Sequence, residues 1–241
     1  MCYNLSLIRQ SRKLEIRFDA QFVDESLYQP VYHASGFSTP YWPVISNHQS
    51  DLIQFFQWGL IPFWVENEST ANIIRTKTLN ARAETVATKS AYRQSIKSKR
   101  CLILTDGFYE YHDQDKKKYP FYIRLKNRDA FALAGIWDTW QDKEHGTVRH
   151  TFSIITTEAN PLLERIHNTR KRMPVILKPE DERKWLRNDL ETAEIISMLA
   201  PYDESQMEAF PVSRLISGRS GNTNTPEAMA HYQYEELVLE S

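Results

Sequence analysis

The sequence has few cysteines, only two among 241 residues, and it lacks the motifs that make cysteine and histidine into metal ligands. Neither Cys-x-x-Cys nor His-Glu-x-x-His occurs, so a disulfide framework and a zinc centre are both excluded. No apolar signal core opens the chain, and no apolar run is long enough to span a membrane. We therefore expect a cytoplasmic protein with no cofactor, no metal and no membrane partner.

An excess of charge of one sign is also lacking, because 30 Lys and Arg residues accompany 31 Asp and Glu residues, a formal net charge of −1 at pH 7. Such a chain is not a polycation that coats nucleic acid, and any nucleic-acid site must be a local basic patch. What the sequence does contain is 41% hydrophobic and 12% aromatic residues, which is typical of a globular protein with a substantial core.

Strand-like segments outnumber helical ones, and the sequence shows no internal repeat and no regular alternation of strand and helix. The strand patterns cover residues 3–8, 52–60, 101–105, 120–125, 131–140, 150–156 and 173–177. The helix patterns cover residues 88–99, 160–167 and 179–187. We expect an α+β fold with a mostly antiparallel, barrel-like β core and peripheral helices. One domain would cover residues 1–216, followed by a flexible C-terminal tail over residues 217–241.

Position 2 carries one of the two cysteines, directly behind Met1. Methionine removal is efficient before a small second residue, so we expect the mature chain to begin at Cys2. Its α-amine, with an ordinary pKa of ~7.7–8.0, and its thiol, with ~8.5, are then both partly available at neutral pH. A 1,2-aminothiol condenses with an aldehyde to an imine, which the thiol closes to a thiazolidine ring. Position alone also allows an incidental cysteine on a frayed terminus.

A polar pattern follows Leu79. Asn80, Arg82 and Glu84 recur at every second position, so an extended segment would present all three on one face, with alanines on the other. Arginine offers a planar fork to phosphate oxygens, and asparagine both donates and accepts hydrogen bonds. This face could hold a phosphate or orient a reacting group. The alternative is a solvated edge strand with a weak Arg–Glu pair.

A carboxylate, Glu110, stands among three aromatic residues, Phe108, Tyr109 and Tyr111. If its side chain points inward, loss of solvation raises its pKa from about 4.3 toward neutrality, which suits a general acid or base. If it points outward, it is an ordinary surface carboxylate.

His167 lies near the end of the helix predicted after Asn160-Pro161, among basic residues that would suit an anionic ligand. Histidine is the side chain best able to move a proton at pH 7. A single histidine can equally be structural.

Two further patterns suggest contact with nucleic acid. The segment Trp58-Gly-Leu-Ile-Pro62 and the aromatic residues after it could form part of the core, or a platform for unstacked bases. Basic residues at helical spacing in the segment predicted as a helix are Lys89, Arg93, Lys97 and Arg100. They form either a solubilising face or a groove that follows a phosphate backbone.

Six motifs occur in a characteristic order: Met1-Cys2, Trp58–Pro62, Asn80–Glu84, Arg100–Glu110, Ala134-Gly-Ile-Trp137, and His167 ahead of Arg172-Met-Pro-Val-Ile-Leu177. Over about residues 1–213 this order resembles the SOS-response-associated peptidase (SRAP) family. The resemblance implies an α+β domain that senses abasic sites in single-stranded DNA covalently. In this family the cysteine that corresponds to Cys2 forms a thiazolidine with the ring-opened deoxyribose aldehyde.

The resemblance also implies roles for single residues. Asn80 would position Cys2 and the sugar, Glu110 would move protons during condensation, and His167 would assist ring opening. Arg82 would hold a DNA phosphate. The remaining residues that we expect to contact DNA are Trp58, Pro62, Lys89, Arg93 and Arg172.

Two positions depart from the family pattern. The family usually begins Met-Cys-Gly-Arg, whereas this chain has Tyr3 and Asn4, so an arginine that would line the site is absent. Residues 168–171 also intervene between His167 and Arg172.

The expected function is a covalent crosslink to abasic sites by a monomer, in the setting of the SOS response and DNA damage. The imine intermediate would also allow weak lyase activity by β-elimination. One alternative is a cysteine peptidase or amidohydrolase, a hydrolase in which Cys2 attacks an acyl carbon. Another is a non-catalytic protein that binds single strands.

Overall fold

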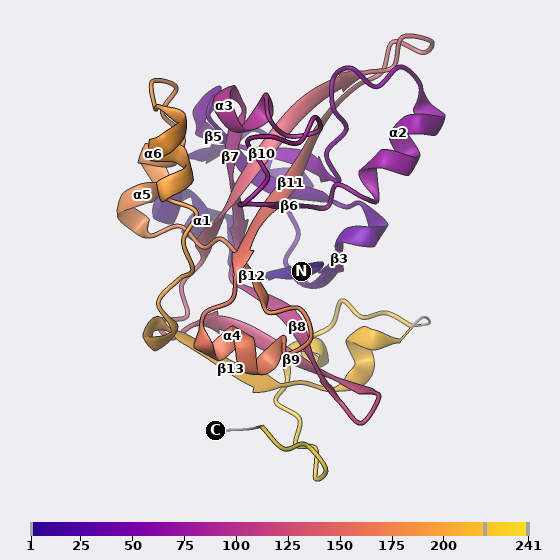
Figure 1. Cartoon of the computed structure of the whole chain (residues 1–241), viewed down its shortest axis with the longest axis vertical. Helices are drawn as coiled ribbons and strands as arrows, with labels where there is room; N and C mark the ends of the chain where they lie inside the picture. The colour runs from indigo at the N-terminus through magenta and orange to yellow at the C-terminus, as the bar shows by residue number, and fades with distance from the viewer. Residues whose placement is uncertain (1, 219–220, 240–241) are drawn as a thin grey trace.

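Two β-sheets form the centre of the molecule in a computed structural model, which describes residues 2–218 and 221–239 (Figure 1). The five-stranded sheet has the order β13-β9-β8-β1-β3, formed by Met207–Pro211, Lys117–Leu125, Gly107–Gln114, Asn4–Leu7 and Val31–Ser35. The eight-stranded sheet has the order β12-β11-β10-β7-β4-β5-β2, formed by Arg172–Pro174, Val148–Glu158, Phe131–Gln141, Arg100–Thr105, Tyr41–Ser46, Gln49–Trp58 and Gln21–Phe22. Its remaining strand, β6 (Asn80–Arg82), pairs with β11.

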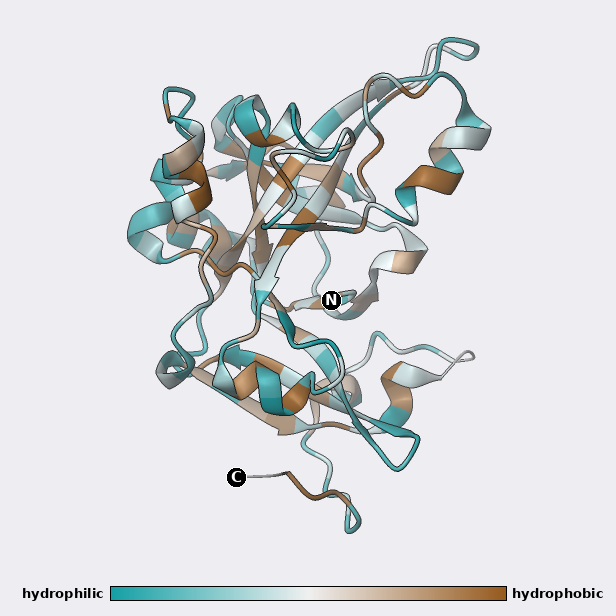
Figure 2. Cartoon of the chain, in the orientation of Figure 1, coloured by the Kyte–Doolittle hydropathy of each residue, from teal (hydrophilic) through white to brown (hydrophobic). Residues whose placement is uncertain are grey.

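The eight-stranded sheet closes on itself. Each strand pairs antiparallel with the next in the order β11, β10, β7, β4 and β5. The two ends of this series, β11 and β5, then pair in parallel, with Thr151 opposite Gln57 and Phe152 opposite Trp58. Closure leaves no free edge in this ring. Figure 2 shows hydrophobic residues along the strands and hydrophilic ones at the tip of the β8–β9 hairpin. The predicted α+β fold with a mostly antiparallel, barrel-like core is confirmed.

Short helices surround the sheets. The α-helices are α1 (Ser11–Phe18), α2 (Glu68–Arg75), α3 (Ser95–Ser98), α4 (Pro161–Ile166), α5 (Pro179–Trp185) and α6 (Thr192–Ser197). The 3₁₀ turns are η1 (Glu25–Leu27), η2 (Gly36–Ser38), η3 (Glu204–Gln206), η4 (Arg214–Ser217) and η5 (Pro226–Met229). The helices predicted from Asn160-Pro161 and Pro179 are confirmed as α4 and α5. Asn160 Oδ1 accepts the backbone N–H of Leu163, and Pro161 occupies the first helical turn.

The helix predicted over residues 88–99 is wrong except for its last turn, α3. Residues 83–94 form consecutive turns. Hydroxyl side chains compete for backbone groups here, as where Thr88 donates to the carbonyl of Thr85. The continuous basic stripe predicted on this helix is therefore also wrong.

Arg100, the last member of that stripe, is completely buried. Its guanidinium donates to the backbone carbonyls of Trp185 at 2.8 Å, Ile96 at 2.9 Å and Lys97 at 2.7 Å, and also to that of Arg187. These hydrogen bonds satisfy carbonyl groups at the C-terminal ends of α3 and α5. They also hold both helices against β7, which begins at Arg100. Arg100 therefore stabilises the fold and is not available to a phosphate.

The segment predicted as a flexible tail has defined partners where the structure describes it. The hydroxyl of Tyr234 donates to the carbonyl of Val212 at 2.7 Å, and His231 forms a β-bridge with Val212. Ala228 of η5 packs with Val212 and Ile216 in a small apolar cluster. The mobility of the tail and the domain boundary at residue 216 stay predictions. Across residues 2–218 and 221–239, no helix is long and apolar enough to cross a membrane.

Candidate functional site

Cys2 is completely buried and lies two residues before the start of β1, the strand between β3 and β8 in the five-stranded sheet. In the register of these strands, Asn4 of β1 lies opposite Tyr109 of β8. The start of β1 therefore brings Cys2 to the part of β8 that carries Glu110. Burial raises the pKa of the Cys2 thiol far above its usual range, and the negative charge of Glu110 raises it further. The sulfur is held as a thiol at neutral pH.

Glu110 points inward, the first of the two orientations that the sequence allows, and it is 3% exposed. Burial raises its pKa to about 7. A carboxyl group with that pKa is a mixture of acid and base near neutral pH. It can therefore both donate and accept a proton there.

His167 follows the last residue of α4 and lies beside this carboxyl group. Its Nδ1 is 3.6 Å from Glu110 Oε2 and donates a hydrogen bond of 3.0 Å to the carbonyl of Arg172. Burial lowers the pKa of His167 to about 4, so the ring is neutral near pH 7 and Nε2 is its basic nitrogen. The structure thus brings Glu110 and His167 together with Cys2.

The four residues between His167 and Arg172 do not displace the histidine from Glu110. The backbone N–H of Lys171 donates to the carbonyl of His167 at 2.8 Å and closes a turn. Lys171 itself has a left-handed backbone, with φ 47°. The inserted residues are absorbed in this tight turn.

Strand β6 places Asn80 and Arg82 as the sequence predicts, with Ala81 buried between them. Asn80 pairs with Ile154 and Arg82 with Thr156 of β11. Both polar atoms of the Asn80 side chain are buried, and within the described part of the chain they have no hydrogen-bond partner. Hydrogen bonds from a ligand to such an amide would stabilise the complex, because they satisfy groups that have no partner in the free protein. Arg82 is exposed.

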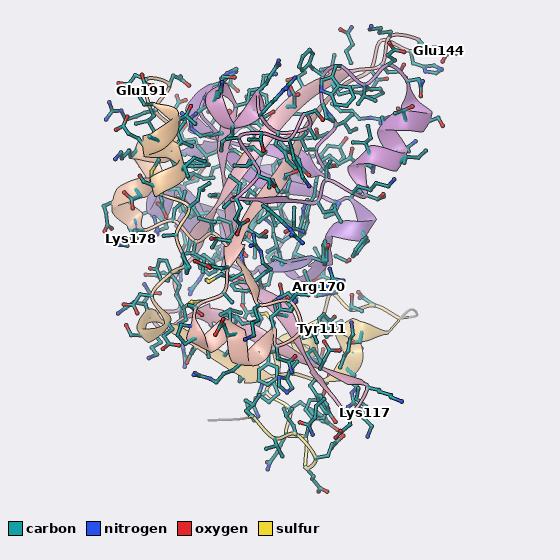
Figure 3. All side chains as sticks on the ribbon, in the orientation of Figure 1. Tyr111, Lys117, Glu144, Arg170, Lys178 and Glu191 are labelled. Atoms are coloured by element: carbon teal, nitrogen blue, oxygen red, sulfur yellow. The ribbon has the colours of Figure 1, made fainter. Side chains whose placement is uncertain are left out.

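Tyr3 lies between the buried groups and the arginines of the site. Burial raises its pKa, the positive charges of Arg170 and Arg82 lower it, and the neighbouring Glu110 and Cys2 groups raise it. All four residues are therefore within electrostatic range of the Tyr3 hydroxyl. Figure 3 labels Arg170 on the loop between α4 and β12, on the side of the molecule where Figure 1 marks the N-terminus.

The ring of Tyr3 also packs against Phe37 of η2, with centroids 4.8 Å apart. Phe37 is 60% exposed. The sequence interpretation did not include Arg170, Tyr3 or Phe37 among the site residues. Their only signal was the basic sequence around Arg170 and the tyrosine beside Cys2.

Trp58 and Pro62 lie inside the protein, not on its surface. The indole N–H of Trp58 donates to the carbonyl of Leu79 at 2.9 Å. A Cβ added to Gly36 would come within 3.0 Å of the Trp58 ring. Trp58 therefore supports η2 on one side and the start of β6 on the other. A direct base contact by Trp58 or Pro62 is not compatible with this burial.

The aromatic side chains that this loop does expose are Phe63, 51% exposed, and Trp64, 47% exposed. Lys89 and Arg93 are also exposed, on the turns before α3. Arg172 has partners already, because its guanidinium is paired with the Glu84 carboxylate and donates to the carbonyl of Thr156 at 2.7 Å.

The site contains a thiol, a carboxyl group balanced between its two protonation states, a neutral imidazole, an amide and exposed guanidinium groups. Within residues 2–218 and 221–239, no group of three or more His, Cys, Asp or Glu side chains could hold a metal ion. These groups can carry out condensation and proton transfer at a carbonyl carbon near a phosphate.

Comparison with known proteins shows the family to which the chain is similar. The model of the SOS response associated peptidase (SRAP) family matches residues 1–218. The protein named abasic site processing protein YoqW of Bacillus subtilis (strain 168) is 38% identical over 230 residues, 94% of this chain and 98% of that protein. Abasic site processing protein HMCES of Xenopus tropicalis is 30% identical over 234 residues, 86% of this chain and 68% of that protein.

Solved structures show the same fold. A crystal structure of a protein from Bacteroides thetaiotaomicron has a TM-score of 0.91 and 38% sequence identity, covering 96% of this chain and 100% of that one. A protein from Bordetella bronchiseptica has a TM-score of 0.75 at 22% identity, covering 88% of this chain and 100% of that one.

Proposed function

We propose that this chain, which belongs to the SOS response associated peptidase (SRAP) family, processes abasic sites in DNA. It does so as a monomer on single strands, by a covalent crosslink through Cys2 after removal of Met1. The observation that carries the proposal is the juxtaposition of Cys2 with Glu110, whose pKa burial raises to about 7, and with neutral His167. Relatives that cover nearly the same length are named abasic site processing proteins.

The crosslink forms in three steps: opening of the sugar, formation of an imine and closure of the thiazolidine ring. The hemiacetal of the abasic sugar first opens to an aldehyde: His167 Nε2 accepts the proton of the hemiacetal hydroxyl, the bond between that carbon and the ring oxygen breaks, and the imidazolium returns the proton to the ring oxygen. The Cys2 amine then adds to the aldehyde carbon, and one of its protons passes to the carbonyl oxygen to give a hydroxyl. The Glu110 carboxylic acid protonates this hydroxyl, which leaves as water, and the Glu110 carboxylate takes back the remaining nitrogen proton to give the imine. The Cys2 sulfur adds to the resulting imine carbon, and its proton passes to the imine nitrogen. The products are a thiazolidine and one molecule of water.

The raised pKa of the thiol fits this order of events. A sulfur that keeps its proton does not compete with the amine for the aldehyde, and it delivers the proton that the imine nitrogen needs. The same pKa disfavours the alternative of a cysteine peptidase or amidohydrolase, because the thiolate is the nucleophile in such enzymes. The imine stage also permits strand cleavage by β-elimination, so weak lyase activity accompanies the crosslink.

The DNA strand would lie across the exposed cations of the site. Arg82 and Arg170 bind phosphates on either side of the abasic sugar, and Lys89 and Arg93 extend the contact. Asn80 donates to the sugar hydroxyl or the departing oxygen. A base next to the abasic site stacks on the exposed ring of Phe37, which packs against Tyr3.

The proposal is tested by incubating the mature protein with single-stranded DNA that carries one abasic site, followed by a denaturing gel. A band that resists denaturation is expected. A tetrahydrofuran site, which has no aldehyde, should give no such band while binding equally well. Reversible binding without a band would leave only a single-strand binder. Hydrolysis of an amide substrate without a band would support the peptidase.

A further inference from the structure

The family model ends at residue 218, and residues of the described segment 221–239 contact the strand next to β1. The Asn224 side-chain oxygen accepts the backbone N–H of Tyr32 at 2.7 Å and that of His33 at 3.4 Å. These donors belong to β3, which is an edge strand of the five-stranded sheet. Asn224 therefore satisfies backbone groups that would otherwise face solvent at this edge.

The neighbouring residue, Thr223, starts a chain of hydrogen bonds that ends on β1. His33 Nε2 is 3.0 Å from Asn4 Oδ1, and His33 Nδ1 is 2.8 Å from Thr223 Oγ1. An amide oxygen can only accept, so Nε2 carries the proton and the Thr223 hydroxyl donates to Nδ1. Burial lowers the pKa of His33 to about 4, which keeps the ring in this neutral form at pH 7.

Asn4 and His33 are both close to the reacting groups along the sheet. Asn4 is two residues after Cys2, at the position where the family usually has arginine, and its Cα pairs with that of Tyr109. The His33 ring meets the Tyr109 ring edge to face, with centroids 5.3 Å apart. Tyr109 is the residue before Glu110. The hydrogen-bonded chain therefore ends where β1 and β8 bring Cys2 and Glu110 together.

We propose that Thr223, His33 and Asn4 form a positioning relay, through which the C-terminal segment fixes the start of β1 and so the place of Cys2 relative to Glu110. The relay includes a residue of the segment beyond residue 218, Thr223, and it rests on the proposed crosslinking function. Small displacements of a reacting group cost rate much more than they cost affinity.

The first test compares Thr223→Val, which keeps the shape and removes the hydroxyl, with Thr223→Ser, which keeps the hydroxyl. Thr223→Val should lower the rate constant of crosslinking at saturating DNA by about threefold to tenfold, with an unchanged Kd for an intact strand. Thr223→Ser should restore the rate. Thr225→Val is the matched control, because the Thr225 side chain bonds Glu227 and not β3.

A second measurement separates the relay from a general loss of stability. Thr223→Val and Asn4→Ala should be non-additive in the rate constant, because each breaks the same chain of bonds. Additive effects, or a rate that falls only in step with the Tm of each variant, would assign Thr223 a purely structural role and overturn the relay. An unchanged rate in Thr223→Val would overturn it as well.

Failure of the proposed function would look different. In that case the unmodified protein gives no crosslink at all, and the relay is judged by NMR. The ¹⁵N shifts of His33 should show a proton on Nε2. The amide signals of Tyr3 and Asn4 should move in Thr223→Val and stay in place in Thr225→Val. Signals that move equally in both variants, or in neither, would exclude the relay.

Discussion

Nδ1 of His167 lies 3.6 Å from Oε2 of Glu110, and burial shifts the pKa values of the two groups in opposite directions. It raises the pKa of Glu110 to about 7 and lowers that of His167 to about 4. Both shifts favour the neutral form of the group. Near pH 7 the pair therefore offers one carboxylic acid that can donate a proton and one imidazole that can accept one, without a formal ion pair.

The first prediction concerns the pH dependence of crosslinking. The amine of Cys2 must be unprotonated, so the rate should rise with pH toward its ordinary pKa of ~7.7–8.0. Glu110 must be protonated, so the rate should fall as the pH rises through about 7. The product of these two fractions is a bell-shaped profile with its maximum between about 7 and 8.

Glu110→Gln should remove the descending limb of this profile and lower the rate about 100-fold or more, with the Kd for an intact strand within about twofold. Glu164→Gln, on an exposed carboxylate of α4, is the matched control and should change neither. Rates come from time courses on denaturing gels at each pH. Parallel losses of rate and affinity in Glu110→Gln would instead mean that Glu110 is structural.

The second prediction uses the unusual state of Asn80. Its amide is buried without a hydrogen-bond partner among the described residues, so it costs free energy in the free protein. Asn80→Ala should therefore leave the free energy of unfolding unchanged or increase it by about 1 kcal/mol. The same change should slow crosslinking at least tenfold. Urea denaturation and single-turnover rates check the two parts, and a clear loss of stability would contradict the assignment of Asn80 to substrate.

Much of the fold follows from local sequence patterns. The apolar run at 101–105 and the strand pattern at 131–140 predict strands within a few residues of β7 and β10. The parallel pairing of β11 with β5 could not be predicted, because it depends on the register of strands far apart in the sequence. The turns of residues 83–94 were missed for a local reason, since the Thr88 hydroxyl bonds to the backbone carbonyl of Thr85.

The site residues also divide into those that local sequence identifies and those that depend on long-range packing. The residue types at Cys2, Asn80 and Glu110 were enough to identify candidates, because each depends on the chemistry of one side chain or one short segment. The pairing of His167 with Glu110 joins residues 57 positions apart (110 to 167), and only the packing of α4 on β8 produces it. Trp58 was misplaced because an aromatic residue beside a Gly–Pro turn fits the core and the surface equally well.

The third prediction distinguishes two arginines. Arg82 is exposed, so Arg82→Ala should weaken binding to any single strand and make the slope of log K against log salt shallower by about one phosphate contact. Arg172 is held by Glu84 and by the Thr156 carbonyl, so Arg172→Ala should lower the Tm and leave the slope unchanged. Fluorescence anisotropy at several salt concentrations measures both slopes. Equal slopes in wild type and Arg82→Ala would remove Arg82 from the phosphate role.

The fourth prediction tests whether both nucleophiles of Cys2 are needed. An uncleaved N-terminal extension leaves the thiol intact but converts the amine to an amide, which cannot form an imine. Such a protein should lose the denaturation-resistant crosslink completely and still bind single strands through Arg82 and its neighbours. Cys2→Ser keeps the amine, so borohydride should trap a transient imine, although no sulfur ring can close.

These two variants separate the aminothiol from an ordinary reactive cysteine. A thiol that attacks on its own is insensitive to acylation of the neighbouring amine, and burial already raises the pKa of this thiol well above its usual range. Sulfur alone is therefore a poor nucleophile here, whereas the amine and sulfur together need no thiolate. If the extended protein still forms a crosslink that survives denaturation, Cys2 acts through sulfur alone and the thiazolidine mechanism is wrong.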